Sequence, residues 1–315
     1  MAARLTSVAL LGAGRWGRQL LRVLEGRCRL VQVGHRGHAD TAAWLAGAYP
    51  HLARTTDGQA ILRDPGVEAV VIATPIATHA ALVQAALEAG KHVFVEKPLA
   101  TDPAEARALV QLAAAQRRVL FVGHVFLYHP AFERLQQLAV QDPVRFAAMA
   151  WQKLGTFEED LYWNLVSHEL AIAMTLFGSR PMLAQTLDAH GLVTACDAAA
   201  IRLGFDEARA CLVTVNRCAP APAKHLTCVT EGGQVLAWNE ARLLRLTPAR
   251  AWEPIPIAHG EPLAREVDAF LACVRGEAGS EANAEMALAV VELVDQLRSF
   301  REPAASRAAP LGGRR

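Results

Sequence analysis

Five short apolar runs, separated by helical segments, constrain the fold of the first 124 residues most strongly. The runs are Val8–Leu11, Leu30–Val33, Ala69–Ala73, His92–Val95 and Val119–Val122. Each is uninterrupted and β-branched in character, as expected for strands that are buried on both faces of a parallel sheet. Gly90 and Pro103 supply helix stop and start signals between these runs. This alternation predicts a doubly wound parallel α/β domain over residues 1–124.

The pattern changes after residue 124, and we expect a second domain over residues 125–300. Helices are predicted over Pro130–Val140, Leu161–Phe177, Leu263–Val274 and Ala284–Phe300. The predicted strands are Val144–Lys153, Leu183–Val193, Ala199–Phe205, Arg209–Arg217, Lys224–Thr230, Gln234–Trp238 and Arg242–Leu246. Turn-like separators such as Ala219–Pro222 predict an α/β domain with a mainly antiparallel sheet. Residues 301–315, rich in Pro, Ala, Gly and Arg, are predicted to form a disordered tail.

Charge and cysteine usage exclude several classes of protein. The chain has 32 Lys+Arg against 31 Asp+Glu, so it lacks the excess of cationic charge that drives binding to nucleic acids or anionic membranes. No apolar run approaches the ~18 residues of a membrane span. The six cysteines are scattered without zinc-binding spacing. We therefore predict no metal site and interpret the cysteines as buried, reduced thiols of a cytoplasmic protein.

A glycine-rich segment, Gly12-Ala-Gly14-Arg-Trp-Gly17, follows the first predicted strand and begins a helix. The glycines permit a tight turn, a close approach of backbone to pyrophosphate, and close packing of helix on strand. The helix N-terminus favours the negative charge of the phosphates. We predict a dinucleotide site here, with Arg15 and Trp16 lining its phosphate and adenine side.

The end of the second predicted strand, Gly34-His-Arg36, bears on the choice of cofactor. An Asp or Glu at this place, about 20 residues after the glycines, would bind the ribose hydroxyls of NAD, and neither is present. Arg36 suits the 2′-phosphate of NADP instead. We predict NADP as the preferred cofactor and NAD as the second choice. The alternative is that Arg36 lies over the adenine or in solvent, with both cofactors used.

Two more motifs lie at the ends of predicted strands. Thr74 and Pro75, followed by His79, end the third strand, and a Glu-Lys-Pro motif at residues 96–98 ends the fourth. Ligands of open α/β sheets bind beyond the carboxyl ends of the strands, which puts Lys97 where the nicotinamide should lie. A lysine there can hydrogen-bond a substrate oxygen and pass its proton. The predicted cofactor contacts are Thr74, Pro75, His79, Glu96 and Lys97.

These motifs together resemble the Gfo/Idh/MocA family, named for glucose–fructose oxidoreductase, inositol dehydrogenase and a rhizopine-catabolism protein. The stretch Ala73–Leu99 is an especially full match. The similarity continues through Val122–Pro130, Asp160–Glu169 and Glu261–Val274, nearly to residue 300. The later stretches look most like the branch that contains UDP-N-acetylated-sugar dehydrogenases.

The resemblance implies an N-terminal Rossmann domain and a C-terminal α/β domain whose open sheet supports one face of the active site and oligomerisation. It implies hydride transfer between NAD(P) and a carbon of a sugar, polyol or sugar nucleotide. Lys97 would then be the catalytic lysine, with a cis bond before Pro98. A homodimer or homotetramer is the expected form.

The family's second-domain motif commonly has Asp and His one helical turn apart, and the corresponding residues here are Asn164 and His168. A spacing of four places both on one helix face, where they can converge on one substrate. His168 is the second catalytic candidate, because an imidazole titrates near working pH. Asn164 can orient a hydroxyl but cannot exchange a proton, so we predict that it binds substrate.

His124 and Tyr128 follow the last strand of the first domain, beside the domain junction. We predict that they contact substrate, with structural hydrogen bonding at the junction as the alternative. Two other functions stay open for the whole chain. One is reduction of an imine or ketone in a biosynthetic pathway. The other is a cofactor-binding regulatory protein, in which Asn164 reflects lost catalysis.

Overall fold

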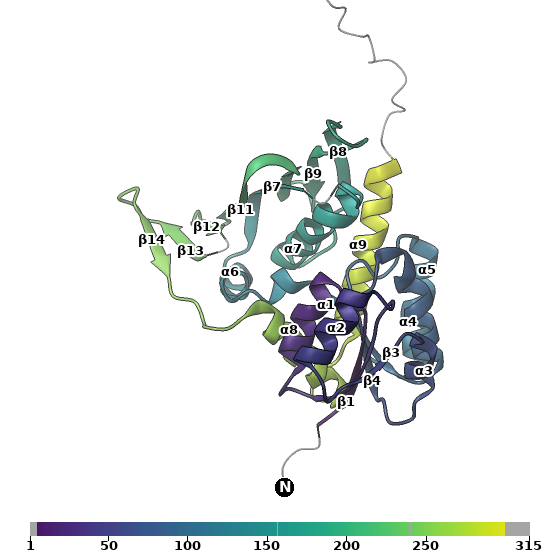
Figure 1. The fold of residues 1–315 in the computed structure, drawn as a ribbon. Coiled ribbons are helices and arrows are strands. Elements are labelled where there is room, and N and C mark those ends of the chain that lie inside the picture. Colours follow the sequence, from purple (N-terminus) through teal and green to yellow (C-terminus); the bar gives the residue numbers. More distant parts are fainter. Residues whose placement is uncertain (1–4, 156, 240, 300–315) are drawn as a thin grey trace, which may run out of the picture.

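A computed structural model describes residues 5–155, 157–239 and 241–299 as two sheets with helices packed around them (Figure 1). The tail predicted over residues 301–315 lies outside these ranges. Among the described residues, no helix has the length and apolar character needed to cross a membrane.

The first sheet has six parallel strands in the order β3-β2-β1-β4-β5-β6, which confirms the predicted doubly wound architecture. Its strands are β1 Ser7–Leu11, β2 Arg29–Gly34, β3 Ala53–Thr55, β4 Ala69–Ile72, β5 His92–Glu96 and β6 Leu120–Gly123. The helices that connect them are α1 Arg15–Leu24, α2 Ala39–Ala48, α3 Gly58–Arg63, α4 His79–Glu88 and α5 Pro103–Gln116. The strand order reverses between β1 and β4, so the loops that follow these two strands diverge and leave a crevice.

Alternate residues of the central strands face two different helical layers. Val8 and Leu10 of β1 pack with α1 and α2, whereas Ala9 and Leu11 pack with α4 and α5. All four side chains are buried. Burial on both faces explains why these strands have continuous apolar sequences rather than alternating ones.

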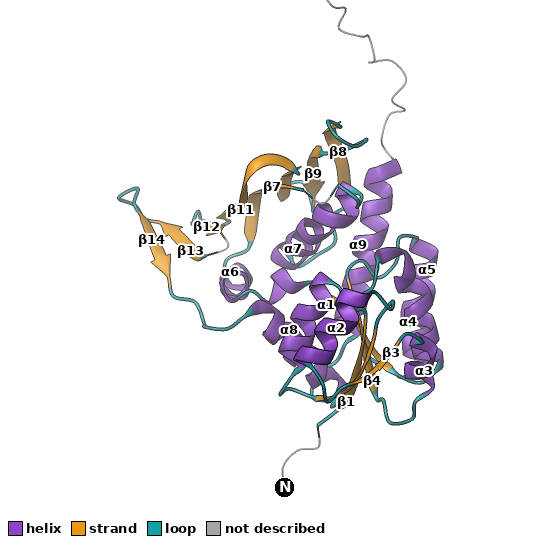
Figure 2. Ribbon diagram, in the orientation of Figure 1, coloured by secondary structure: helices purple, strands orange, loops and turns teal. Residues whose placement is uncertain are grey.

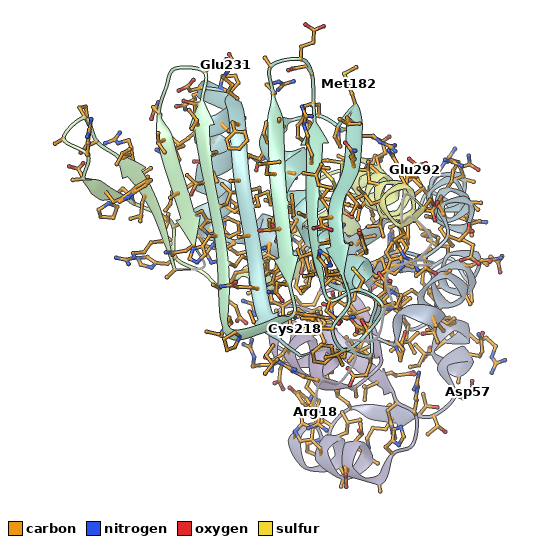
Figure 3. The ribbon with its side chains drawn as sticks, turned by 90° about the horizontal axis from the view of Figure 1, so that it is seen from above. Arg18, Asp57, Met182, Cys218, Glu231 and Glu292 are labelled. Carbon is orange, nitrogen blue, oxygen red and sulfur yellow. The ribbon has the colours of Figure 1, made fainter. Side chains whose placement is uncertain are left out.

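The second sheet has eight strands in the order β14-β13-β12-β11-β7-β10-β9-β8. They are β7 Val144–Leu154, β8 Leu183–His190, β9 Ala198–Gly204, β10 Ala210–Asn216, β11 Cys218–Thr230, β12 Val235–Asn239, β13 Arg242–Leu246 and β14 Trp252–Ile255. Only β7 and β10 pair in parallel among the described strands of this sheet, so the mainly antiparallel prediction is confirmed. Figure 3 views this sheet with Met182 and Glu231 at one end of the strands and Cys218 at the other.

One face of the second sheet is covered by helix α6 (Pro130–Gln141), the π-helical turn η3 (Tyr162–Val166) and helix α7 (Ser167–Phe177) (Figure 2). The helix predicted over Leu161–Phe177 is therefore present, with its first turn in π-helical form. On the opposite face, Phe146 of β7 and Leu212 of β10 are each 38% exposed. The second sheet is thus open on that face.

The turn predicted at Ala219–Pro222 is wrong, because these residues belong to β11. The pairing of β11 with β7 skips from Cys218–Leu154 to Ala223–Gln152. Pro220 and Pro222 lie in this irregular part, where their missing N–H groups break no regular ladder. Arg217 alone separates β10 from β11, and the chain crosses there from one side of β7 to the other.

The last two helices, α8 (Pro262–Val274) and α9 (Glu281–Ser299), return to the first sheet. The Phe270 ring of α8 lies 5.6 Å from that of Phe94 and 5.8 Å from that of Phe121, centroid to centroid. On the other face, Asn283 of α9 donates to the carbonyl of Val122 (3.1 Å) and accepts from its N–H (2.7 Å). The predicted boundary at residue 124 stays a prediction, and helices from beyond it complete both faces of the first sheet.

Candidate active site

A cavity of about 430 Å³ lies at the carboxyl edge of the first sheet, between the loops that follow β1, β2 and β4. It lies in the crevice that the reversal of strand order creates. The predicted site residues that line it are Gly12, Gly14, Arg15, Trp16, Arg36, Thr74 and Pro75.

The glycine-rich turn is shaped to receive a pyrophosphate. Gly12 has φ +101°, and a Cβ there would lie 2.5 Å from the carbonyl oxygen of Ala73. A Cβ at Gly17 would lie 1.8 Å from the carbonyl oxygen of Gly12, so this glycine permits the close packing of α1 on the turn. Gly14 is the N-cap of α1 and has no capping side chain in the described structure. The first N–H groups of the helix are therefore available to an anion, and these residues fit a dinucleotide.

His79 lies behind the cavity rather than in its lining. Its Nδ1 is 2.8 Å from the carbonyl oxygen of Pro98, and its Nε2 is 2.9 Å from that of Thr74. Burial lowers the pKa of His79, against the opposing effect of these two carbonyl partners. His79 thereby ties the loop after β4 to the cis Lys97–Pro98 bond.

Lys97 reaches from the end of β5 to the helix of the second half of the chain. Its Nζ donates to the carbonyl oxygen of Asn164 (2.8 Å) and to that of Trp163 (3.3 Å). Burial lowers the pKa of Lys97 to about 8. A lysine of this pKa can both hold and release a proton near neutral pH.

His168 begins the second turn of the same helical segment and is buried. Its ring lies edge-on to Phe126 and Trp151, with centroids 5.1 and 5.3 Å away. Burial, together with the positive charges of Lys97 and Lys224, holds the pKa of His168 well below its usual value. The imidazole is therefore neutral at neutral pH.

Asn164 is buried in η3, and its main-chain carbonyl is the group that binds Lys97. Sequence reasoning considered only its side-chain amide, and it missed Trp163 as a second carbonyl. His124 is buried, and burial lowers the pKa of its ring to about 4. Tyr128 is half-buried with its ring 6.1 Å from that of Phe121. The substrate contacts assigned to Asn164, His124 and Tyr128 stay predictions.

A hydrogen bond joins the cavity to the Glu-Lys-Pro motif. The indole N–H of Trp16, which lines the cavity, donates to a carboxylate oxygen of Glu96. Burial raises the pKa of Glu96 to about 7, against the opposing effects of Trp16 and Lys97. The glycine-rich turn and the motif that carries Lys97 are thus in direct contact.

The fold and this edge of the sheet define a Rossmann oxidoreductase with a site for NAD(P). Residues 6–124 match the model of the oxidoreductase family with an NAD-binding Rossmann fold, Gfo/Idh/MocA. This match confirms the resemblance to the family that the Ala73–Leu99 motif indicated.

The chain is similar to a sugar-nucleotide dehydrogenase and to an inositol dehydrogenase. The chain is 29% identical over 222 residues to the UDP-N-acetylglucosamine 3-dehydrogenase of Acidithiobacillus ferrooxidans, covering 65% of this chain and 71% of the relative. The solved structure of an enzyme of that name and organism superposes with a TM-score of 0.85 at 23% identity, covering 93% of this chain and 96% of that one. The inositol 2-dehydrogenase of Rhizobium meliloti is 37% identical over 135 residues, which are 42% of this chain and 40% of the relative.

A biliverdin reductase of Synechocystis, solved with biliverdin and NADP+, has the same fold. Its TM-score is 0.78 at 21% identity, covering 93% of this chain and 98% of that one. The fold therefore does not by itself define a substrate.

Proposed function

We propose that the chain is an NADP-preferring dehydrogenase that transfers a hydride to or from an alcohol or ketone carbon of a sugar-like substrate, such as a sugar nucleotide or polyol. The observation that carries this proposal is a hydrogen bond of 2.8 Å from Lys97 Nζ to the main-chain carbonyl of Asn164. Asn164 lies on the same helical segment as His168. A proton-exchanging lysine from one half of the chain and an imidazole from the other thereby flank one region. The two sugar and inositol dehydrogenases among the relatives support the substrate class.

The cofactor would be held by the residues that line the cavity. Gly12, Gly14 and the first turn of α1 suit its pyrophosphate, and Arg36 suits a 2′-phosphate. The bound nicotinamide supplies or accepts the hydride.

Lys97 and His168 would move the proton of the substrate hydroxyl. In the oxidation of an alcohol, a neutral His168 or Lys97 accepts the hydroxyl proton as the carbon loses its hydride. In the reverse direction, protonated Lys97 donates to the carbonyl oxygen. Asn164 would orient the hydroxyl without exchanging a proton.

A substrate panel followed by NADP(H) absorbance tests the proposal. We expect turnover with UDP-N-acetylhexosamines or cyclic polyols and their ketones. Turnover confined to imines or to ketones without sugar-like hydroxyls would replace this function with a biosynthetic reductase. Tight NADPH binding without turnover of any compound would favour a regulatory protein.

Replacing Arg36 by alanine is expected to weaken NADPH binding by about tenfold or more, since a guanidinium–phosphate contact is lost. The affinity for NADH should stay unchanged, because NADH carries no 2′-phosphate. Fluorescence titration of both cofactors against both proteins gives the four constants needed. Equal NADH and NADPH affinities, unchanged in the variant, would refute the NADP preference.

We infer that the chain also self-associates through the open face of the second sheet. Phe146 and Leu212 on this face are partly exposed, and the neighbouring side chains of the central strands include Ala148, Thr214 and Thr227. Small and apolar side chains on an open sheet suit packing against a second copy. Sedimentation of the purified protein distinguishes monomer, dimer and tetramer. Cys28, Cys211, Cys218, Cys228 and Cys273 form no disulfide in the described structure, which supports the cytoplasmic location that we infer.

A further inference from the structure

Glu266 of α8 lies over the carboxyl end of β5, on the face of the first sheet away from α4 and α5. Phe270, one helical turn later, packs on Phe94. Glu96 follows Phe94 by two residues and therefore shares its face of the strand. Since residues four apart share one face of a helix, Glu266 faces the strand end where Glu96 lies.

The space at this strand end exists because β6 ends in glycine. Gly123 pairs in register with Glu96. A Cβ at Gly123 would lie 3.2 Å from each carboxylate oxygen of Glu96 and 3.0 Å from the ring of Phe94. The carboxylate of Glu96 therefore lies against the backbone of Gly123, beneath α8.

Glu266 is 0% exposed, and neither of its side-chain oxygens has a hydrogen-bond partner in the described structure. The main-chain N–H of His124 favours the charged form of Glu266, but burial opposes it more strongly. A buried carboxylate with so little compensation is costly to ionise, so Glu266 takes the neutral form. Glu96 differs, because it accepts from Trp16 and lies next to the Lys97 ammonium. Burial, and then the charge of Glu96, raise the pKa of Glu266 well above its usual value.

Among the described residues, the other titratable groups around Glu266 do not offer it a cation. His124, at the end of β6, is buried, and burial keeps its ring neutral at neutral pH. Burial, followed by the charge of Glu266, raises the pKa of Tyr128, which is also neutral. On the exposed flank of α8, Arg22 and Arg27 of the first half pair with Glu261 and Asp268.

We propose that Glu266 is a positioning residue that keeps one proton beside Glu96 and thereby holds a single negative charge next to the catalytic lysine. The two carboxyl groups share one proton at neutral pH. Protonated Glu266 supplies an O–H toward the carboxylate of Glu96, which Trp16 holds from the other side. The effect on catalysis rests on the proposed role of Lys97, whereas the location of the proton does not.

Thermal unfolding tests the proton without any activity. A carboxyl group whose pKa is raised by folding contributes stability that is lost as pH rises from its unfolded value towards its folded one. Glu266→Gln removes this loss. The Tm of the variant minus that of the unchanged protein should therefore increase between about pH 5.5 and pH 8.5, by several degrees.

Asp268→Asn, on the exposed flank of the same helix, is the matched control. Its Tm difference should stay constant over this pH range, because its side chain lies at the surface beside Arg27 and is not buried against Glu96. A constant difference for Glu266→Gln as well would overturn the proposal, since Glu266 would then be ionised in the folded protein.

The pH profile of turnover tests the effect on Lys97. Glu266→Gln keeps a neutral donor, so kcat near pH 7 should stay within about threefold of that of the unchanged protein. Glu266→Leu removes the donor and should lower kcat by about tenfold, because Glu96 loses its fixed orientation. In ketone reduction, kcat should fall at a lower pH in Glu266→Gln than in the unchanged protein. The reason is that the variant cannot form a second negative charge near Lys97, which would help Lys97 to keep its proton at high pH.

Identical pH profiles for all three proteins would overturn the positioning role. Absence of turnover in the unchanged protein would count against the proposed function alone. The thermal experiment would then still decide where the proton resides.

Discussion

Replacing Lys97 by methionine should lower kcat by about 10²–10⁴-fold, the usual contribution of a proton-transferring group. Cofactor affinity should change little, because the glycine-rich turn and Arg36 are untouched. The side chain keeps its length, so β5 and the cis Lys97–Pro98 turn should be retained. Steady-state kinetics together with NADPH titration separate the two effects.

Lys97→Arg is the control that separates charge from proton transfer. It keeps a cation near the carbonyls of Asn164 and Trp163, but a guanidinium does not release its proton at working pH. We expect it to be nearly as inactive as the methionine variant. Full activity in either variant would remove Lys97 from catalysis.

The lowered pKa of Lys97 also predicts a pH dependence. Since burial lowers this pKa to about 8, ketone reduction should slow as pH rises through that value and Lys97 loses its proton. Alcohol oxidation should instead speed up as the neutral amine becomes available. Opposite slopes in the two directions, measured as kcat against pH, are the expected result.

Replacing Asp197 by alanine should lower the free energy of unfolding by about 3–5 kcal/mol, or the Tm by roughly 10 °C. Asp197 is 0% exposed and its carboxylate accepts from Nε of Arg217 at 2.9 Å. It also accepts from the N–H groups of Leu192, Val193 and Thr194. The variant removes the anionic partner of a buried guanidinium, which still donates to the carbonyls of Glu159 and Cys196. It also removes the acceptor of three loop N–H groups. Scanning calorimetry measures the change.

Asp188→Asn offers a comparison at an exposed site nearby. Asp188 pairs with His190 at 2.9 Å, but both side chains are about two-thirds exposed. An exposed contact of this kind contributes little, so the Tm of Asp188→Asn should differ from that of the unchanged protein by no more than about 1–2 °C. Equal effects at the two sites would contradict the importance of the buried Asp197–Arg217 pair.

The fold was predictable where burial leaves a continuous pattern in the sequence. The strands at Val8–Leu11 and Ala69–Ala73 could be read because both of their faces are buried. The three-residue edge strand β3 has two exposed residues, and so it leaves no such pattern. The strand predicted to reach Val193 ends at His190, because Asp197 binds the N–H groups that a longer strand would use.

The site was predictable in its side chains but not in its main-chain contacts. The glycine pattern predicted Gly12, and positions at strand ends predicted Arg36 and Lys97. The expected roles of these residues depend on residue type, which is read directly from the sequence. The carbonyls that bind Lys97 depend instead on a π-helical turn, a rare conformation that the residue types did not predict. The sequence placed Glu266 in a predicted helix. Its position over Glu96 could not be predicted, because it depends on how α8 packs on the first sheet.

That return bears on how the molecule is made. The nascent chain completes β6 at residue 123, yet α8 and α9 emerge only after the whole second sheet. Until then Phe94, Phe121 and the main chain of Val122 lack the partners that they have in the finished protein. The cofactor half is therefore no self-sufficient module during translation. The β5–β6 end of its sheet lacks the packing of α8 and α9 until these two helices have been synthesised.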